Sequence, residues 1–256
     1  MLYLYISLKI KIVLAFLLIS SILVTYKRCW KLAKKNAGLT DYVYEKIKQR
    51  LITCEYAPNS VLNEAQIAAE LGCSRTPTRE AIIQLERQGF LHIIPKKGIY
   101  VSAITANEIM QIFQARKEIE PVALKMGRAN LDNDVLLDFK TRFSRDTDDY
   151  MSGYKLDTAM HMYFVENCRN NFIIDMMHSV FDKNTRIIIA SKENQLHVNE
   201  SRREHLEIIN LLLKKEYEEA GMKLSEHIDH CRLAALESFY STNTETQSSI
   251  YKQYLE

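Results

Sequence analysis

Apolar residues recur at helical spacing from the start of the first well-patterned segment. In "TDYVYEKIKQRLI", Val43, Ile47 and Leu51 stand at positions i, i+4 and i+8, with charged residues between them. This spacing places all three side chains on one face of a helix. The pattern therefore predicts an amphipathic helix that begins near Thr40 and ends before Pro58.

Two shorter helices are predicted next, with a tight turn between them. The segment "NEAQIAAELG" begins with Asn63, a typical N-cap, and closes on Gly72, a typical helix stop. Ser74 or Thr76 can cap the following helix, and Pro77 suits its first turn, where a backbone N–H has no intrahelical partner. Gly89 ends that helix, and its buried side is predicted to consist of Ala81, Ile82, Leu85 and Phe90.

A hairpin completes this region. The runs "FLHII" and "IYV" have the composition of strands, and they flank Pro95-Lys96-Lys97-Gly98, which predicts a turn with a basic tip. Helix, helix, tight turn, helix and hairpin form the order of a winged helix-turn-helix. In that fold the hairpin is a wing, and Lys96 and Lys97 at its tip can reach the DNA backbone or the minor groove.

The opening turn of the third helix carries chemistry that suits DNA. In a helix-turn-helix, the N-terminal residues of the second helix of the motif enter the major groove. Ser74, Thr76 and the free N–H groups can bind phosphate. Arg75 and Arg79 are four residues apart on one helix face and can reach guanine edges. The structural alternative is that both arginines are merely solvated and that Ser74 is only a cap.

The rest of the chain predicts an all-α domain. After Thr105, a predicted N-cap, helical spacing runs through 106–130 and then through segments near 132–150, 154–168, 171–190, 199–215 and 216–240. Ile109, Ile112, Phe113, Ile119, Val122 and Leu124 are the predicted apolar positions of the first helix, with a bend expected at Pro121. The fold class is therefore mostly α, with a winged helix-turn-helix at 38–103, a six- or seven-helix bundle at 104–242, and a polar tail at 243–256.

Charge is distributed unevenly along the 256 residues, although the net charge is only +2. Residues 1–37 carry seven Lys and Arg and no acidic residue, whereas residues 104–256 carry 19 basic and 25 acidic residues. No broad basic face is implied, so DNA binding must depend on a few placed side chains. The five cysteines include no Cys-x-x-Cys pair, which argues against a disulfide framework or a thiolate zinc site and suits a reducing compartment.

The N-terminal segment has two interpretations. Residues 12–26 form a 15-residue uncharged apolar run flanked by lysines, slightly short of the about 20 residues that a spanning helix needs. One interpretation is a non-functional extension from a misassigned start. The other is a membrane tether, in which case the basic residues that follow the run would keep the remaining chain in the cytoplasm.

One acidic residue and three histidines in the helical half form a candidate metal site. Asp157 and His161 are four residues apart on one predicted helix face, and His205 and His227 stand near apolar rows of two further helices. Imidazole and carboxylate groups suit Zn, Ni, Mn or Fe ions. Taken singly, each histidine is more often a satisfied core or surface residue than a metal ligand.

The stretch that contains "GCSRTPTREAIIQLERQGFLHIIPKKGIYV" resembles the GntR family of bacterial transcription regulators, whose signature runs through the Ser-Arg-Thr-Pro-x-Arg-Glu-Ala core. The resemblance covers about residues 40–103. It implies a dimer on a palindromic double-stranded DNA operator, with DNA contacts at Ser74, Arg75, Thr76 and Arg79 and with Gly98 in the wing. Asn59 stands where the family usually has Gly, and asparagine can adopt the same turn geometry.

Residues 106–240 resemble the FCD-type ligand-binding domain of the FadR subfamily. The matching patterns are "RKEIE" at 116–120, Asp-x-x-x-His at 157–161, and Glu-His at 204–205 followed by His227. The resemblance implies a divalent metal held by Asp157, His161, His205 and His227, with a small carboxylate bound beside it. It also places Arg116 and Asn171 at positions that line the effector cavity. The alternatives for these two are an ion pair with Glu120 and a helix cap.

The sequence and the resemblance together predict a cytoplasmic, homodimeric DNA-binding transcription regulator, most simply a repressor, that responds to a small carboxylate metabolite. The chain is not expected to be an enzyme. A metal-dependent hydrolase that uses the Asp and His cluster is the alternative from the enzyme class. It would need a positioned general base beside an open metal position, and no supporting motif such as His-Glu-x-x-His is present. The third alternative is a membrane-tethered DNA-binding sensor.

Overall fold

The computed structural model describes residues 38–145, 150–191 and 195–253. These residues form two compact units. One contains the chain up to Leu51 together with Asn59–Ser102, and the other contains Ile52–Pro58 and the chain from Ala103 onward. The prediction of a mostly helical protein with a small N-terminal sheet is confirmed.

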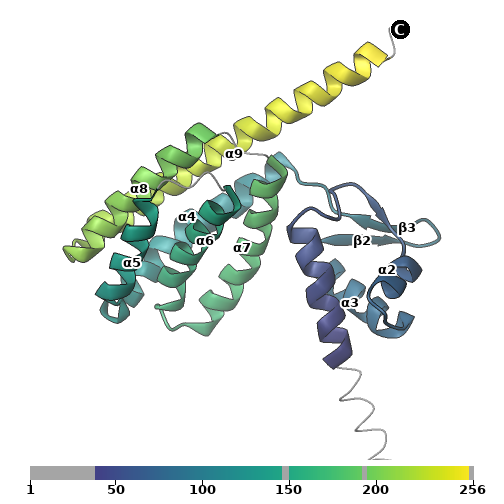
Figure 1. The fold of residues 1–256 in the computed structure, drawn as a ribbon, viewed down its shortest axis with the longest axis horizontal. Helices are drawn as coiled ribbons and strands as arrows, with labels where there is room; N and C mark the ends of the chain where they lie inside the picture. The colour runs from purple at the N-terminus through teal and green to yellow at the C-terminus, as the bar shows by residue number, and fades with distance from the viewer. Residues whose placement is uncertain (1–37, 146–149, 192–194, 254–256) are drawn as a thin grey trace, which may run out of the picture. The chain divides into compact units, whose positions relative to one another are not determined.

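The first unit is a winged helix-turn-helix. Its first helix covers residues 38–52, and it is followed by strand β1 (Val61–Leu62), helices α2 (Glu64–Glu70) and α3 (Arg75–Arg87), and strands β2 (Leu91–Ile94) and β3 (Gly98–Val101). The loop between β2 and β3 projects from the rest of the unit as a wing (Figure 1). The predicted stripes are buried: Val43, Ile47 and Leu51 on the first helix, and Ala81, Ile82 and Leu85 on α3.

Local chemistry fixes the ends of these helices as the sequence predicts. Asn63 caps α2, because its side chain accepts hydrogen bonds from the N–H groups of Ala65 and Gln66 at 2.9 and 3.2 Å. Gly72 follows α2 with φ +64°, and Gly89 follows α3 with φ +78°. Both values lie in the left-handed region that glycine adopts without steric cost. Asn59 also has a positive φ, 67°, so asparagine does adopt the turn conformation there.

The sheet has one more strand than the sequence predicted. β3 lies between β1 and β2, and both pairings are antiparallel. Val61 pairs with Tyr100, and His92 pairs with Tyr100 from the other side. A two-residue strand carries too little alternation to be recognised in sequence, and it forms here because β3 offers it a free edge. Asn59 adds a hydrogen bond from its N–H to the Val101 carbonyl at 3.1 Å.

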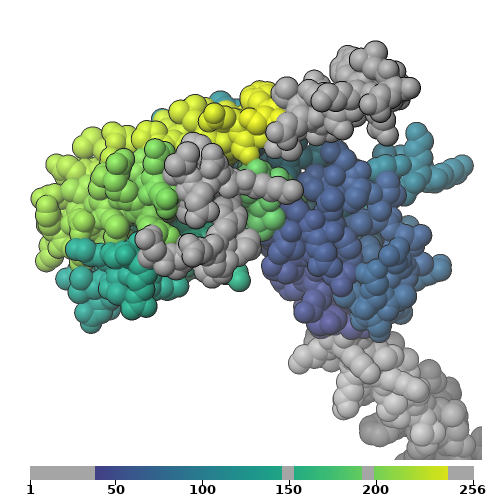
Figure 2. Space-filling model, turned by 45° about the horizontal axis from the view of Figure 1, so that its top comes forward, coloured from purple at the N-terminus to yellow at the C-terminus, as the bar shows by residue number. Residues whose placement is uncertain are grey.

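The second unit is a bundle of six α-helices, counted over the described residues, with one short 3-10 turn (Arg128–Asn130). The helices are α4 (Ala106–Gly127), α5 (Asn133–Phe143), α6 (Tyr150–Glu166), α7 (Asn171–Ser191), α8 (Gln195–Leu213) and α9 (Tyr217–Gln253). Thr105 caps α4 by accepting from the Glu108 N–H at 3.1 Å, as predicted. Figure 1 shows α9 running alongside α8 and α4, and Figure 2 shows α8 and α9, in green to yellow, at the surface of the bundle.

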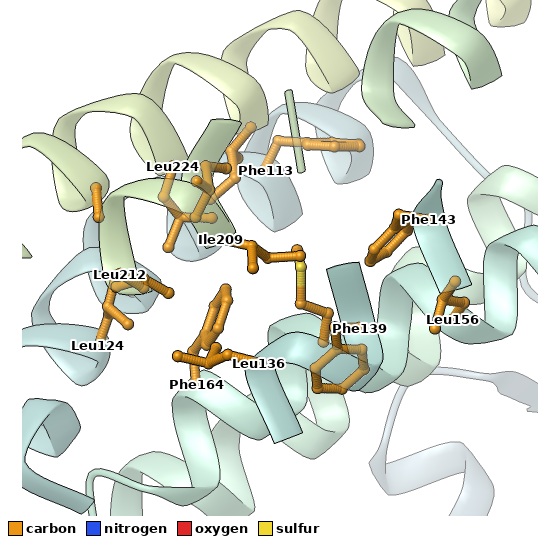
Figure 3. Packing of buried hydrophobic residues seen from close by; sticks show 14 of the residues in the cluster. Phe113, Leu124, Leu136, Phe139, Phe143, Leu156, Phe164, Ile209, Leu212 and Leu224 are labelled. Carbon is orange, nitrogen blue, oxygen red and sulfur yellow. The ribbon is translucent and has the colours of Figure 1, made fainter. Parts of the chain in front are cut away.

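Aromatic and aliphatic side chains fill the space between these helices. Phe113 of α4, Phe164 of α6, Ile209 of α8 and Leu224 of α9 are at most 1% exposed and point into one shared core (Figure 3). Burial of apolar surface on this scale is the main stabilising contribution to such a bundle. The core also surrounds the polar groups described below, which are therefore held in fixed positions.

Three details of the bundle differ from what the hydrophobic pattern of the sequence predicts. Val122 was assigned to the apolar stripe of α4, but it is 51% exposed, and Ala123 is buried in its place. The expected helix at 132–150 ends at Phe143, and α6 begins at Tyr150, before the predicted start at 154. α9 continues to Gln253, through most of the stretch predicted to be a polar tail. Polar composition does not stop a helix that contains no proline or glycine in that stretch.

A close approach between α4 and the end of α6 gives a stability prediction. A Cβ atom on Gly127 would lie 2.7 Å from the Asn167 carbonyl carbon, a backbone atom that cannot move aside, whereas a Cβ on Gly153 would meet nothing within 4 Å. Gly127→Ala is therefore expected to destabilise the protein by about 1–3 kcal/mol through overpacking. Gly153→Ala, inside α6, should be neutral or stabilising by up to about 1 kcal/mol. Urea unfolding of both variants checks this, and equal midpoints would contradict the packing described.

Among the described residues, no helix combines the length and apolar character needed to cross a bilayer. Residues 12–26, on which the predicted membrane tether depends, lie outside the described residues. The tether and the alternative of a non-functional extension therefore remain predictions.

Candidate nucleic-acid interface and metal centre

The first turn of α3 presents the predicted DNA-contacting groups to solvent. Ser74, Arg75, Thr76 and Arg79 are all exposed, whereas Pro77 and Thr78 of the same turn are buried. The Thr78 hydroxyl donates to the Ser74 carbonyl at 3.0 Å, which fixes the entry of the chain into the helix. Ser74 occupies the N-cap position by its backbone, but its side chain makes no capping hydrogen bond. Its hydroxyl is therefore available to another acceptor or donor.

The electrostatics of this turn favour a negatively charged partner. The first turn of α3 contains no acidic residue, so its free N–H groups and the positive end of the helix dipole are not neutralised locally. Within the described part of the chain, neither Arg75 nor Arg79 has an ion pair. Their four-residue spacing puts both guanidinium groups on the exposed face of the helix. The arrangement can accept phosphate at the helix end and base edges along the face.

The wing provides a second basic position. Lys96 and Lys97 are exposed between β2 and β3, and Lys96 has φ 64°, which produces the tight reversal at the tip. Gly98 follows with φ +130°, and a Cβ there would meet the Val61 side chain at 3.4 Å. The backbone conformation at Gly98 therefore favours glycine, and its predicted place in the DNA-binding wing stays a prediction.

The four predicted metal ligands converge inside the bundle. Asp157 and His161 lie on α6, His205 lies on α8 and His227 lies on α9. One ligand atom from each residue lies within 4.8 Å of the ligand atoms of the other three. His205 Nε2 is 3.0 Å from both Asp157 Oδ1 and His227 Nε2, and His161 Nε2 is 3.7 Å from Asp157 Oδ1. A metal bound at about 2.0–2.2 Å to such atoms separates neighbouring donors by roughly 3–3.5 Å.

Two buried glutamates orient the imidazole rings. Glu120 contacts Nδ1 of His161, and Glu204 Oε2 lies 2.8 Å from Nδ1 of His227. In each case Nδ1–H donates to the carboxylate, which leaves the Nε2 lone pair facing the other three donors. Carboxylates paired with histidine in this way are typical outer partners of metal ligands, because they fix both ring orientation and tautomer.

Burial favours the neutral, metal-binding form of two of the histidines, His205 and His227. His161 and His227 are 0% exposed, and His205 is 1% exposed. Desolvation, followed by the neighbouring His205, lowers the pKa of His227 to about 3, and desolvation also lowers the pKa of His205. Burial alone would raise the pKa of Asp157, but the adjacent imidazoles and Arg116 lower it well below its usual range. At neutral pH, His205 and His227 are therefore neutral imidazoles and Asp157 is a carboxylate.

These shifts predict the acid sensitivity of the metal-free protein. Because the pKa of His227 falls from about 6.5 in the unfolded chain to about 3 in the fold, the unfolded chain binds more protons between these values, and stability falls as pH drops through that window. The lowered pKa of Asp157 acts in the same direction at lower pH. Urea midpoints measured in chelator should therefore be lower at pH 5 than at pH 7.5. His227→Gln should reduce the difference and the exposed control His178→Gln should not; a midpoint independent of pH would contradict the assignment.

A buried arginine lies beside the cluster. Arg116 is 1% exposed, and its Nε donates to Glu120 at 2.7 Å while its Nη1 donates to the Asn184 side-chain oxygen at 3.2 Å. The guanidinium carbon also lies over the Phe181 ring at 4.8 Å. Burial would lower the pKa of Arg116, but Glu120 and Asp157 raise it above the ordinary value, so the group stays charged. The ion pair with Glu120, the structural alternative for Arg116, is therefore present.

Of the two predicted effector residues, only Arg116 lies at the cluster. Asn171 is the exposed first residue of α7, and Asn184, thirteen residues further along α7 and about 20 Å away, contacts Arg116. The helix-cap alternative for Asn171 applies instead to its neighbour Asn170, whose side chain accepts from the Phe172 N–H at 3.1 Å. The structure places Asn171 at the exposed start of α7 and Asn184 in a buried turn of the same helix. Several asparagines fall in and before α7, and sequence position alone does not tell which of them lies in a buried turn.

The sequence reasoning missed the outer partners of the histidines. Glu204 also accepts from His230 Nδ1 at 2.5 Å, which joins His230 to the cluster although its side chain is 60% exposed. Glu120 lies four residues after Arg116, and Glu204 immediately precedes His205. The sequence did contain one signal for these partners. Both glutamates stand on helix faces whose neighbouring residues are predicted to be buried, and a buried carboxylate needs a partner.

Comparison with known proteins identifies both domains. Residues 39–101 match the bacterial regulatory proteins of the gntR family, and residues 111–230 match the FCD domain. An uncharacterized HTH-type transcriptional regulator in an unstable DNA locus of Streptomyces ambofaciens is 34% identical over 122 residues, which cover 46% of this chain and 52% of that protein. The uncharacterized HTH-type transcriptional regulator YdhC of Bacillus subtilis is 23% identical, over 73% of this chain and 86% of YdhC. The HTH-type transcriptional repressor RspR of Escherichia coli is 20% identical over 73% of this chain and 84% of RspR.

Solved structures share the fold. A GntR regulator candidate from Rhodococcus sp. RHA1 superposes with a TM-score of 0.67 at 20% identity, over 78% of this chain and 98% of that chain. McbR/YncC of Escherichia coli gives a TM-score of 0.66 at 17% identity, over 78% of this chain and 98% of that chain. With a gntR-type helix-turn-helix followed by an FCD domain, the architecture that fits the FadR subfamily, the chain belongs to the GntR family of DNA-binding transcription regulators.

Proposed function

We propose that this transcription regulator is controlled by a small carboxylate that binds beside a divalent metal in the FCD bundle. The observation that carries the proposal is the convergence of four ligand atoms, from Asp157, His161, His205 and His227, within 4.8 Å of one another in a protein that also has a DNA-binding domain. The regulator acts in the cytoplasm as a homodimer on a palindromic operator, and repression is the simplest mode of control.

The donor set fits a divalent transition metal. Three imidazoles and one carboxylate match the preferences of Zn, Ni, Mn and Fe ions, whereas Ca²⁺ and Mg²⁺ prefer all-oxygen sites. His161 Nε2 is buried, and no hydrogen-bond partner for it is found among the described residues. A buried nitrogen of this kind is costly to leave unpaired, and coordination to a cation would satisfy it. When bound, the metal supplies a Lewis-acidic position at which an anionic ligand can bind.

The unpaired polar atoms beside the cluster favour a ligand rich in acceptors. Arg116 Nη2 and Asn184 Nδ2 are both buried donors, and within the described part of the chain neither has a partner. The two side chains are hydrogen-bonded to each other, so one ligand beside them could accept from both. A carboxylate offers two acceptor oxygens with the charge that Arg116 prefers. We therefore replace Asn171 with Asn184 in the proposed effector site and retain Arg116.

Further hydroxyl groups lie at the same end of the site. Tyr154 donates to the Thr185 hydroxyl at 2.7 Å, and Thr185 is adjacent in sequence to Asn184. The Thr158 hydroxyl, one residue after Asp157, is buried and interacts with the Tyr154 hydroxyl. Hydroxyl groups in this position suit a ligand that carries hydroxyls of its own, such as a hydroxy acid or a sugar acid.

The covalent connection between the two units offers a route for control. Arg116 and Glu120 lie on α4, which begins at Ala106, and only four residues separate it from the end of β3 at Val101. A ligand that bonds to Arg116 changes the balance of contacts at the centre of α4, the helix that this short linker joins to β3. The coupling free energy equals the difference in ligand affinity between the states with high and low DNA affinity.

The enzyme alternative is not favoured. A metal-dependent hydrolase would leave the gntR-type DNA-binding domain unexplained, and the named relatives are transcriptional regulators or repressors. The membrane-tethered sensor differs from the proposed function only in residues 1–37, and separation of membrane and soluble fractions from cells expressing the full chain distinguishes the two.

A carboxylate panel tests the effector site. Zn-loaded protein is expected to show a rise in melting temperature with at least one hydroxy or sugar acid, because a ligand that binds only the folded state stabilises it. Asn184→Ala should weaken that ligand roughly 5- to 10-fold, as expected for the loss of one hydrogen bond of about 1 kcal/mol. Asn171→Ala is the matched control and should respond like the parent. Equal responses from Asn184→Ala and the parent, or a loss confined to Asn171→Ala, would contradict the assignment.

The same ligand should change operator binding. Titration of the metal-loaded parent against a labelled operator, with and without the acid, measures the coupling, which is expected to be about 5- to 150-fold in affinity. An acid that raises the melting temperature but leaves DNA affinity unchanged would show that the site binds ligand without controlling the DNA-binding domain.

A further inference from the structure

The solvent-facing end of the metal cluster contains a histidine that the proposed function does not use. His230 lies three residues after the ligand His227 on α9, so both side chains project from the same side of the helix. The side chain of His230 is 60% exposed, whereas His227 is fully buried. Glu204 of α8, whose side chain is only 8% exposed, joins the two histidines. The three residues thus form a chain from solvent to the cluster.

Both oxygens of the Glu204 carboxylate are engaged. Oε1 lies 2.5 Å from Nδ1 of His230, and Oε2 lies 2.8 Å from Nδ1 of His227. An ionised carboxylate can only accept, so each imidazole donates its Nδ1–H to it. Nε2 of His227 then carries a lone pair, and it lies 3.0 Å from Nε2 of His205. One carboxylate therefore links the orientation of a buried ligand to that of an exposed ring.

The other buried carboxylate of the cluster is held in the same way. Glu120 contacts Nδ1 of His161 through Oε2, and its Oε1 accepts from Nε of Arg116 at 2.7 Å. In both cases a glutamate orients a metal ligand with one oxygen while another side chain holds its second oxygen. The two holding residues differ in position, because Arg116 is 1% exposed and His230 is at the surface. The repetition indicates that a hold on the second oxygen is part of how the cluster is built.

The second hydrogen bond matters because a glutamate side chain is not rigid. The last torsion of glutamate has broad, two-fold preferences, so a carboxylate with a single partner can rotate away from it. Two hydrogen bonds, from residues three apart on one helix, restrict this rotation of Glu204. A fixed carboxylate in turn fixes the ring orientation and the tautomer of the imidazole that donates to it.

We infer that His230 is a positioning residue of the metal centre, which holds the Glu204 carboxylate and thereby keeps Nε2 of His227 directed at the other three ligands. This inference rests on the metal site of the proposed function. His230 does not belong to the ligand group and acts through Glu204. A substitution at the protein surface therefore changes how tightly a buried ion is held.

Substitutions of His230 test this role. Zn²⁺ affinity, measured by competition with a chromophoric chelator, should fall about 3- to 10-fold in His230→Ala, less than the about 10- to 100-fold typical of a direct partner of a ligand. His230→Asn should stay close to the parent, because the amide nitrogen of asparagine is bonded to Cγ, as Nδ1 is, and can donate in its place. His178→Ala, which removes a histidine of similar exposure from α7, is the control and should bind like the parent. Equal affinities of His230→Ala and the parent, or equal losses in His230→Ala and His230→Asn, would overturn the inference.

A double substitution tests whether His230 acts through Glu204. In the Glu204→Ala background, His230→Ala should cause no further loss of Zn²⁺ affinity, since the group on which it acts is gone. Losses that add would show that His230 acts by another route and would overturn the inference. Melting of each metal-free variant checks that it is folded, and Glu204→Gln replaces Glu204→Ala if the latter is not.

NMR of the metal-free protein gives a readout that does not depend on metal uptake. Nitrogen-15 spectra should show His227 as the Nδ1–H tautomer in the parent and in His230→Asn, and this signal should be broadened or lost in His230→Ala. A His227 signal unchanged in His230→Ala would overturn the hold of His230 on the ring. If the parent takes up no Zn²⁺, the metal site of the proposed function fails and the inference with it. If the parent binds Zn²⁺ and His230→Ala binds it equally, only the role of His230 fails.

Discussion

Replacing Arg75 or Arg79 with alanine is expected to reduce operator binding roughly 5- to 150-fold for each variant, which corresponds to about 1–3 kcal/mol. Both side chains are exposed on one face of α3, and neither is held by an ion pair in the described part of the chain. Their charges and donors are therefore available to base edges, and their loss should relax specificity at the positions that they contact. The operator can be selected from random DNA with the parent protein, and affinities compared by titration at one fixed salt concentration.

Two control variants distinguish base recognition from charge alone. Arg87→Ala removes the same charge at the exposed last turn of α3, about 18 Å from Arg75, and it should cost far less. Lys97→Ala, at the wing tip, should weaken binding to specific and random DNA evenly and should reduce the salt dependence. If both α3 arginine variants bound the selected operator as tightly as the parent, α3 would not be the recognition helix.

Removal of the metal is expected to lower the stability of the bundle substantially. An ion that binds only the folded protein and is present at 100 times its dissociation constant contributes about 2.7 kcal/mol. For a unit of this size, that corresponds to a fall in melting temperature of about 5–11 °C on chelation. His161→Ala or His227→Ala should lose this response and the effector response, because each removes one ligand atom from the cluster.

DNA binding should survive these two substitutions in the absence of effector, since the winged helix-turn-helix has its own core. His178→Ala is the matched control, because His178 lies on α7 with its side chain 55% exposed. It should bind metal like the parent. A parent protein whose melting temperature is the same with chelator and with added Zn²⁺, Ni²⁺ or Mn²⁺ would contradict the expected stabilisation.

The winged helix-turn-helix could be predicted from sequence in detail because short-range rules determine it. Asn63 as a cap, Gly72 and Gly89 as helix stops, and the buried stripe of α3 all depend on residues within one or two turns. The missing strand β1 depends instead on an edge of β3 that is nearly forty residues away in sequence. Its two residues carry no periodic signal of their own.

The metal cluster was predicted by residue type, but its surroundings were not. Convergence of His205 and His227 on α6 follows from packing between helices, which spacing alone does not specify; the family resemblance supplied that information. The outer partners Glu120 and Glu204 and the choice of Asn184 over Asn171 needed the structure, because each depends on which side of a helix faces its neighbouring helix. The prediction that Val122 is buried was wrong for a related reason. Several consecutive apolar residues in α4 are compatible with more than one buried face.

The metal content of the purified protein tests the central claim most directly. Protein prepared without an affinity tag, stripped and then reconstituted with Zn²⁺, Ni²⁺ or Mn²⁺, should contain about one divalent ion per chain by elemental analysis. His227→Ala, prepared in the same way, should contain almost none. Less than about a tenth of an equivalent in the reconstituted parent, or equal metal in the parent and His227→Ala, would show that the four converging residues are not a metal site.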